Sequence, residues 1–175
     1  MILKNVTDTR LVLAIITLVV ISGTTIITTQ VLGIKFAATM SGDQVSPLTD
    51  TSVNGTASFR TTTHDTVIKY KIKIAGSSDV TSADIHMGKK GENGEAVVDL
   101  LKDSKKNGIK LGTSIRGNIT SSDLKGPLKG KILAELISAM RNGNTYVNID
   151  TPYHQNGEIR GQIDLRGNIN STKVK

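Results

Sequence analysis

Most of this chain alternates apolar and polar residues with a period of two, the pattern of strands that bury one face. The clearest stretch is 68–74, where Ile68, Tyr70, Ile72 and Ile74 alternate with Lys69, Lys71 and Lys73. Near the C-terminus, Ile159, Ile163 and Leu165 stand opposite Arg160, Gln162, Asp164 and Arg166 in the same way. Because successive side chains of a strand point to opposite faces, one face is expected to be buried and the other solvated. About eight such strands with short turns predict an all-β fold of two antiparallel sheets packed face to face.

Residues 81–100 are predicted to form two neighbouring strands. Alternation places Ile85 and Met87 on one side of the first strand and Asp84 and His86 on the other. Two potential ligands therefore project from one face of the predicted sheet.

The connection between these strands contains Asn93-Gly94. This pair readily takes the positive φ angles of a tight hairpin turn. We expect the turn there, with the second strand running from Glu95 to Leu101.

A single helix is predicted among the strands. Its apolar residues recur at helical spacing: Ile132, Leu133, Leu136, Ile137 and Met140. Asn142-Gly143 supplies a left-handed stop. We expect this short helix to cover one end of the fold, with its apolar stripe in the core.

The N-terminal residues predict export. Residues 11–33 carry no charged side chain and follow Lys4 and Arg10. Leu11 to Ile21 has the length of a signal-peptide core, whereas the whole uncharged run reaches the ~20 residues that cross a bilayer as a helix. Both interpretations stay open: residues 1–33 are a cleaved signal peptide, or a signal anchor with one hydrophobic transmembrane helix at about 11–33. Residues 34–168 then form one domain and 169–175 a polar tail.

Several stretches together carry a resemblance to a known family. They are Asp84-Ile-His-Met-Gly88, Gly91 to Leu100, Asp123-Leu-Lys-Gly-Pro-Leu128, Leu133 to Gly143, Tyr146 to Thr151, Gly157 to Ile163 and Ala38 to Pro47. In this pattern and spacing, roughly residues 35 to 166 resemble the CHRD domain, named after chordin and found in many microbial extracytoplasmic proteins. The resemblance implies a Greek-key β-sandwich, similar to the immunoglobulin-like and copper–zinc superoxide dismutase architecture.

The candidate chemistry lies on two predicted strands. Asp84 and His86 are joined by Asp150 and His154 near the end of another strand. In the CHRD pattern histidine is usual at 84 and 150, so the chain departs from the family there. Carboxylate and imidazole side chains suit zinc or manganese, or calcium if carbonyls join. The alternative is a hydrogen-bonded polar cluster that holds the loops and binds no metal.

The amino-acid composition limits the kinds of site and binding partner that are expected. The chain has no cysteine, which removes disulfides, thiolate metal sites and cysteine nucleophiles. Its formal net charge is +7, which suits contact with anionic envelope polymers or lipid headgroups. Nucleic acid is not expected, because few aromatic residues are present to stack bases and no helix carries the lysines.

Known catalytic patterns are missing. The chain has three histidines, His64, His86 and His154, too few for the copper site of a dismutase. It also lacks Gly-x-Ser-x-Gly, His-Glu-x-x-His and a phosphate-binding glycine loop. We therefore expect a non-catalytic extracytoplasmic module without a cofactor, membrane-anchored or secreted, that binds a cell-surface protein, a glycan or copies of itself. The alternative is an envelope protein that binds a divalent metal such as zinc.

Overall fold

The structure is a computed structural model that describes residues 14–21, 24–31, 33–62, 64–76, 79–102 and 114–166. The strands are β1 (Ala14–Ile21), β2 (Thr24–Val31), β3 (Lys35–Ser41), β4 (Asn54–Thr61), β5 (Ile68–Ala75), β6 (Ser82–Met87), β7 (Ala96–Asp99), β8 (Ile115–Ile119), β9 (Thr145–Asp150), β10 (Ile159–Gln162) and β11 (Asp164–Leu165). One α-helix, α1 (Leu133–Arg141), and three short 3-10 helices, η1 (Gly42–Gln44), η2 (Ser121–Asp123) and η3 (Gly126–Leu128), complete the described elements. The predicted all-β class with one helix is confirmed.

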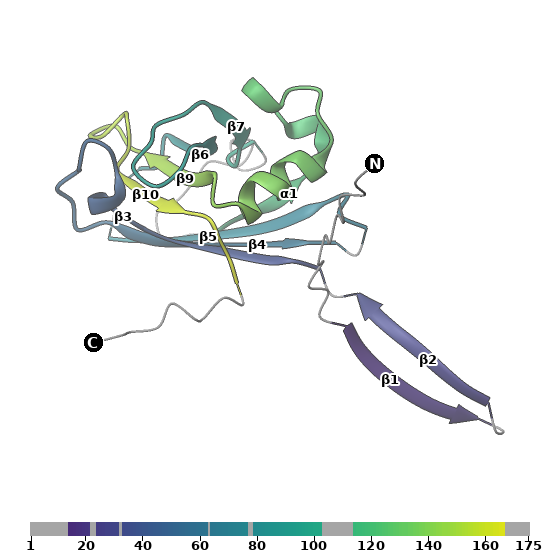
Figure 1. The fold of residues 1–175 in the computed structure, drawn as a ribbon. Coiled ribbons are helices and arrows are strands. Elements are labelled where there is room, and N and C mark those ends of the chain that lie inside the picture. The colour runs from purple at the N-terminus through teal and green to yellow at the C-terminus, as the bar shows by residue number, and fades with distance from the viewer. Residues whose placement is uncertain are drawn as a thin grey trace, which may run out of the picture.

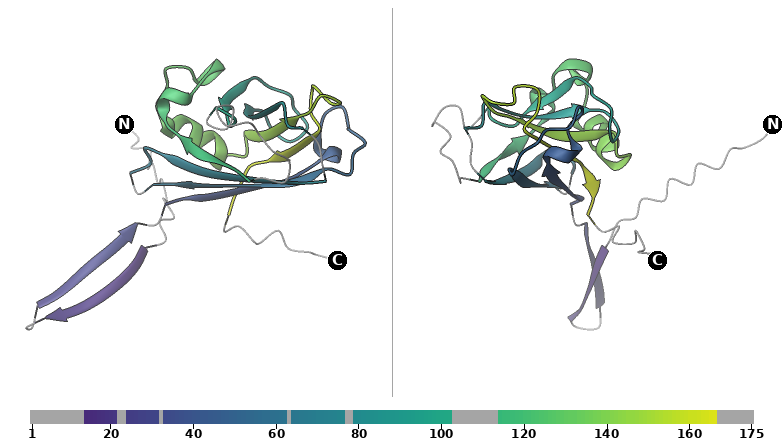
Figure 2. Two further views of the ribbon diagram at one scale, coloured as in Figure 1. Left: turned by 180° about the vertical axis from the view of Figure 1, so that it is seen from behind. Right: turned by 90° about the vertical axis from the view of Figure 1, so that its left-hand side faces the viewer.

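The strands of the domain form one antiparallel sheet that folds over on itself. Its order is β7-β6-β9-β10-β3-β4-β5-β8, and β11 pairs with β3. The two halves join where β10 pairs with β3, at Arg160 opposite Ser41. In Figures 1 and 2, β3, β4 and β5 make one layer, and β6, β9 and β10 lie across it. The layers therefore belong to one continuous sheet, where the sequence predicted two.

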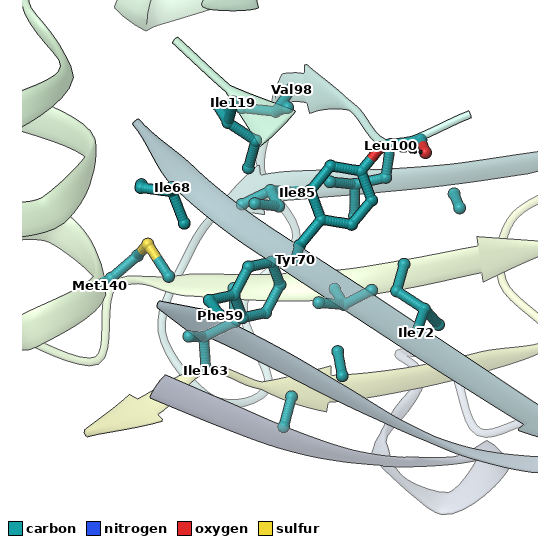
Figure 3. Packing of buried hydrophobic residues seen from close by; sticks show 14 of the residues in the cluster. Phe59, Ile68, Tyr70, Ile72, Ile85, Val98, Leu100, Ile119, Met140 and Ile163 are labelled. Carbon is teal, nitrogen blue, oxygen red and sulfur yellow. Dashed lines mark hydrogen bonds between the residues drawn. The ribbon is translucent and has the colours of Figure 1, made fainter. Parts of the chain in front are cut away.

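The core fills the space between these layers. Phe59 and Tyr70 point into it from the β4–β5 layer, Ile85 comes from β6, and Met140 comes from α1 (Figure 3). The Tyr70 hydroxyl donates a hydrogen bond of 2.7 Å to the Leu100 carbonyl, which ties the two layers together. The period-two prediction for β5 is confirmed, since its even-numbered apolar residues from 68 to 72 are buried and its lysines face outward.

The helix α1 follows the predicted pattern. Leu133, Leu136, Ile137 and Met140 are buried. Ile132, by contrast, precedes the helix and is 66% exposed, so it lies outside the apolar stripe. The stop is confirmed, because Gly143 takes a φ of 65° just after the helix.

The expected N-terminal helix is not observed. β1 and β2 pair as an antiparallel hairpin, with Ala14 opposite Val31 and Ile21 opposite Thr24. Both strands are rich in Ile, Val and Thr, whose branched side chains favour strands over helices. Among the described residues, no helix combines the length and apolar character needed to cross a membrane. Residues 1–13, 22–23, 32 and the tail from 167 lie outside the described residues, so the leader and tail boundaries stay predictions.

The turn between β6 and β7 differs from the prediction. Positive φ angles occur at Gly88, at 145°, and at Gly91, at 82°. The Glu92 amide donates to the Lys89 carbonyl across the turn. Asn93 and Gly94 are not the tight turn. The Asn93 side chain instead bridges two distant segments, as described below.

Candidate functional site

The predicted ligands lie on a polar face formed by three adjacent strands. Register aligns His86 with Tyr146 and Gln162, Asp84 with Asn148 and Arg160, and Ser82 with Asp150. These eight residues are called the polar face below. The opposite side of the same strands carries buried Ala83, Ile85, Val147, Ile149 and Ile159. The predicted alternation of Asp84 and His86 against Ile85 is therefore confirmed.

An aromatic stack lies at one end of the polar face. The rings of His86 and Tyr146 are stacked, with centroids 5.1 Å apart and planes at 18°. The Arg160 guanidinium carbon lies 3.5 Å from the centroid of the Tyr146 ring. A guanidinium over an aromatic ring is attracted by the ring's quadrupole, so the three side chains support one another.

Arg160 also holds the connection between β6 and β7. Its Nη2 donates to the carbonyls of Lys89 and Glu92 at 2.9 and 2.8 Å, and its Nη1 donates to Asn93 Oδ1 at 3.0 Å. Asn93 Nδ2 donates in turn to the Ser46 carbonyl at 2.8 Å. The sequence predicted Arg160 on the solvent face, but it is 2% exposed. That prediction was wrong because the loop covers the outer side of β10.

His86 serves the same loop. Its Nδ1 lies 2.9 Å from the Gly94 carbonyl, and the Tyr146 hydroxyl accepts a hydrogen bond of 3.2 Å from the Gly94 amide. With one ring nitrogen on a carbonyl, His86 is oriented by the loop and stacked on Tyr146.

Asp84 is paired with a cation of the chain itself. Lys125 Nζ donates to Asp84 Oδ1 at 2.6 Å, and the Ser82 hydroxyl donates to Asp84 Oδ2. Asp84 is 8% exposed. A buried carboxylate requires such partners, because burial alone strongly disfavours its charge.

Asp150 is the most perturbed carboxyl of the polar face. Its pKa is raised to about 6, first by burial and then by the nearby Asp84 carboxylate. His86 and a hydrogen bond of 2.6 Å from Asn148 Nδ2 act in the opposite direction. The pair of carboxylates therefore favours a proton, or another positive charge, at this end of the face.

His154 does not join the other predicted ligands. Its Nε2 lies 3.7 Å from Glu158 Oε2, and Glu158 also accepts hydrogen bonds from the hydroxyls of Thr51 and Thr151. Glu158 is 4% exposed. The structure thus separates the four predicted ligands into an Asp84–His86–Asp150 group and a His154–Glu158 pair.

No group of three or more histidine, aspartate or glutamate side chains within the described ranges is arranged to hold a metal ion. The metal hypothesis stays a prediction, and the polar-cluster alternative describes the contacts above.

Sequence reasoning missed Lys125, Tyr146, Asn148 and Arg160 as members of this site. Tyr146 and Asn148 alternate with Asp150 on one strand, so the period-two rule already placed all three on one face. Lys125 directly precedes η3, far along the chain from Asp84, and no local pattern indicates its partner.

The comparisons with known proteins identify the family. A family model described as the CHRD domain matches residues 36–163. The chain belongs to the CHRD domain family. Its matched region runs from Phe36 in β3 to the end of β10 and includes the polar face. Comparison with curated proteins and with solved structures finds no significant match. Membership of the CHRD family indicates a module of extracellular type.

Proposed function

We propose that this CHRD protein is a non-catalytic extracytoplasmic module, held at the cell membrane or secreted, that acts as a cell-surface binding or structural unit. The proposal rests on the contacts that the side chains of the polar face make. Three of its ionisable side chains are hydrogen-bonded within the chain: His86 and Arg160 to the β6–β7 loop, and Asp84 to Lys125. Side chains fixed in this way position a loop, and a module of this kind presents its loops to a partner.

We also propose that the domain is a Greek-key sandwich. β3, β4 and β5 follow one another as neighbours, whereas the chain then crosses to β6 and β7 on the other half and returns to pair β8 with β5. Such crossings between halves support a sandwich-like arrangement with loops gathered at its ends. Loops at the ends of a sandwich vary without loss of the core, which suits a binding module.

Attachment to the membrane is supported by the sequence before the domain. The uncharged run 11–33 ends two residues before β3 begins at Lys35. An uncleaved run would keep the domain close to the bilayer, and a cleaved one would release it.

Fractionation of cells, with determination of the N-terminus of the mature protein, tests this function. We expect the protein in the membrane fraction with residues 1–33 present, or in the medium with a start near Ile34. Recovery of the full-length chain in the cytosolic fraction would contradict export.

A second candidate is metal binding in the envelope. The observation that favours it is the raised pKa of Asp150 beside Asp84, because a divalent ion would relieve the repulsion between the two carboxylates. Metal analysis of protein purified without chelator, compared with Asp84→Ala/His86→Ala, tests it. Stoichiometric zinc, manganese or calcium lost in the variant would establish this function. Equal, sub-stoichiometric metal in both proteins would remove it.

A further inference from the structure

The outer side of the β3–β4–β5–β8 layer is a concentrated basic surface. Its cations are Lys35 of β3, Arg60 of β4, Lys69, Lys71 and Lys73 of β5, and Arg116 of β8. Together with Arg166 they are called the basic face below. The four strands contain no aspartate or glutamate. The nearest carboxylate in the register is Asp164, opposite Ala37 at the β11 edge.

Like charges face one another across this layer. Arg60 is paired in register with both Lys35 and Lys69, and Lys71 is paired with Arg116. Like charges directly opposite on neighbouring strands destabilise a sheet. The Arg116 charge, followed by loss of hydration and by Lys73, lowers the pKa of Lys71. An anionic partner would remove this repulsion, which is a physical reason for binding one.

The basic face also has a concave part of suitable chemistry. Five of its cations, with Ser58, line one open depression of about 310 Å³: Lys35, Arg60, Lys69, Lys71 and Arg166. Arginine and lysine around a shallow hollow match phosphate groups in charge and in hydrogen bonding, since both supply only donors.

The position of this surface favours a lipid bilayer over a soluble polymer. The uncharged apolar run 11–33 leads directly into Lys35, which lies in the depression. In Figures 1 and 2 the β1–β2 hairpin extends from the outer side of the β3–β4–β5 layer, the side that carries the basic face. Basic residues beside an apolar membrane segment are drawn to anionic headgroups, and two such signals together give stable attachment.

We infer that the basic face docks on the phosphate headgroups of an anionic membrane, which orients the domain with β6, β9 and β10 turned away from the bilayer. This inference rests on the proposed display of the domain outside the cytosol. Docking leaves the loops around the polar face free to meet a partner.

The absence of cysteine permits a direct test on the full chain. Thr56→Cys places one thiol on the outer side of β4, opposite Lys73, and Ser138→Cys places one on the exposed side of α1. Each protein is labelled with a fluorophore and mixed with phosphatidylglycerol or phosphatidylcholine vesicles that carry a headgroup quencher. We expect stronger quenching at position 56 on phosphatidylglycerol than on phosphatidylcholine, with the difference removed in 1 M salt, where the screening length falls to about 3 Å. The label at position 138 is expected to stay bright.

A charge variant and a matched control complete the test. Lys69→Gln/Lys71→Gln/Lys73→Gln is expected to weaken docking on the order of 100-fold, from roughly fivefold per charge at the surface. Lys90→Gln/Lys129→Gln/Lys131→Gln removes as many exposed charges elsewhere and should dock normally. The inference would be overturned by equal quenching at the two labels, by quenching at position 56 of the same size on both kinds of vesicle, or by no quenching at position 56. The inference would also be overturned if soluble polyphosphate shielded the label at position 56 and vesicles did not. That result would mean that the basic face binds a soluble polymer. Because vesicle docking is measured in vitro, its failure is distinct from a failure of export in the fractionation.

Discussion

The Arg160 guanidinium lies 3.5 Å from the centre of the Tyr146 ring and holds three acceptors of the β6–β7 loop. Arg160→Ala removes the stack and leaves two loop carbonyls without their donor. We expect a loss of about 3 kcal/mol in the free energy of unfolding, measured by urea denaturation. Arg160→Lys should recover only part of this loss, because an ammonium lacks the planar fork.

The matched control for this prediction is Arg116→Ala, at the same Arg-Gly motif but on an exposed strand face. It should change stability by less than about 0.5 kcal/mol. Equal losses for the two alanine variants would show that Arg160 does not hold the loop.

Asp150 makes stability depend on pH in a defined direction. Its pKa is raised from 3.8 to about 6, first by burial and then by Asp84, so the folded protein binds this proton more tightly than the unfolded chain does. Protonation of Asp150 therefore stabilises the folded protein. This stabilisation is complete below about pH 4 and is lost as the pH rises through about 6. Such a difference corresponds to roughly 3 kcal/mol, which partial solvent exposure reduces to about 1–2 kcal/mol.

Asp150→Asn keeps an oxygen for Asn148 and removes the titration. At pH 7.5 it is expected to stabilise the protein by about 1–2 kcal/mol, and between pH 4 and 7 its urea stability curve should be flatter than that of the natural protein. Asp79→Asn, at an exposed position, is the control and should leave the curve unchanged. Parallel curves for the natural protein and Asp150→Asn would contradict the account of this carboxyl.

Neutralising Lys71, which stands opposite Arg116, is expected to raise the stability of the protein. Lys71→Thr keeps a good strand residue opposite Arg116 and should slightly raise the urea midpoint at low salt. The gain should fade in 1 M salt, since exposed charges are then screened. A gain of the same size at both salt concentrations would mean that strand propensity, rather than charge, is responsible.

Close packing of Gly117 against Tyr70 gives a further prediction. A Cβ at position 117 would overlap the Tyr70 hydroxyl and ring, and that hydroxyl is bonded to Leu100. Gly117→Ala should cost about 1–3 kcal/mol in the free energy of unfolding. Adding Tyr70→Phe to Gly117→Ala should cost less than the sum of the two single changes, because the overlapping hydroxyl is gone. Strict additivity would show that the two residues do not compete for the same space.

Much of the fold follows from local pattern. Alternation in Ile68 to Ile74 and the helical spacing from Leu133 to Met140 both correspond to observed elements, because burial of one face is what selects them. Alternation within a strand cannot show whether another segment of the chain covers the strand's polar side. Arg160 and Arg166 share an Arg-Gly motif, yet the β6–β7 loop covers only Arg160.

The site was predictable to a similar extent. Sequence placed Asp84 and His86 on one face, and register brings Asp150 beside them. Lys125, which pairs with Asp84, lies 41 positions away and reaches it only through the tertiary fold. For the N-terminal run, the local pattern itself is ambiguous. Its composition suits both a helix in lipid and the observed strands, and the sequence does not show which environment surrounds it.

Display of the domain outside the cytosol is tested most directly by labelling Ser138→Cys on intact cells with a membrane-impermeant maleimide. The chain has no cysteine of its own, so any label on the protein reports this single exposed position on α1. We expect equal labelling before and after lysis, on the cell surface or in the medium. Labelling that occurs only after lysis would contradict the account.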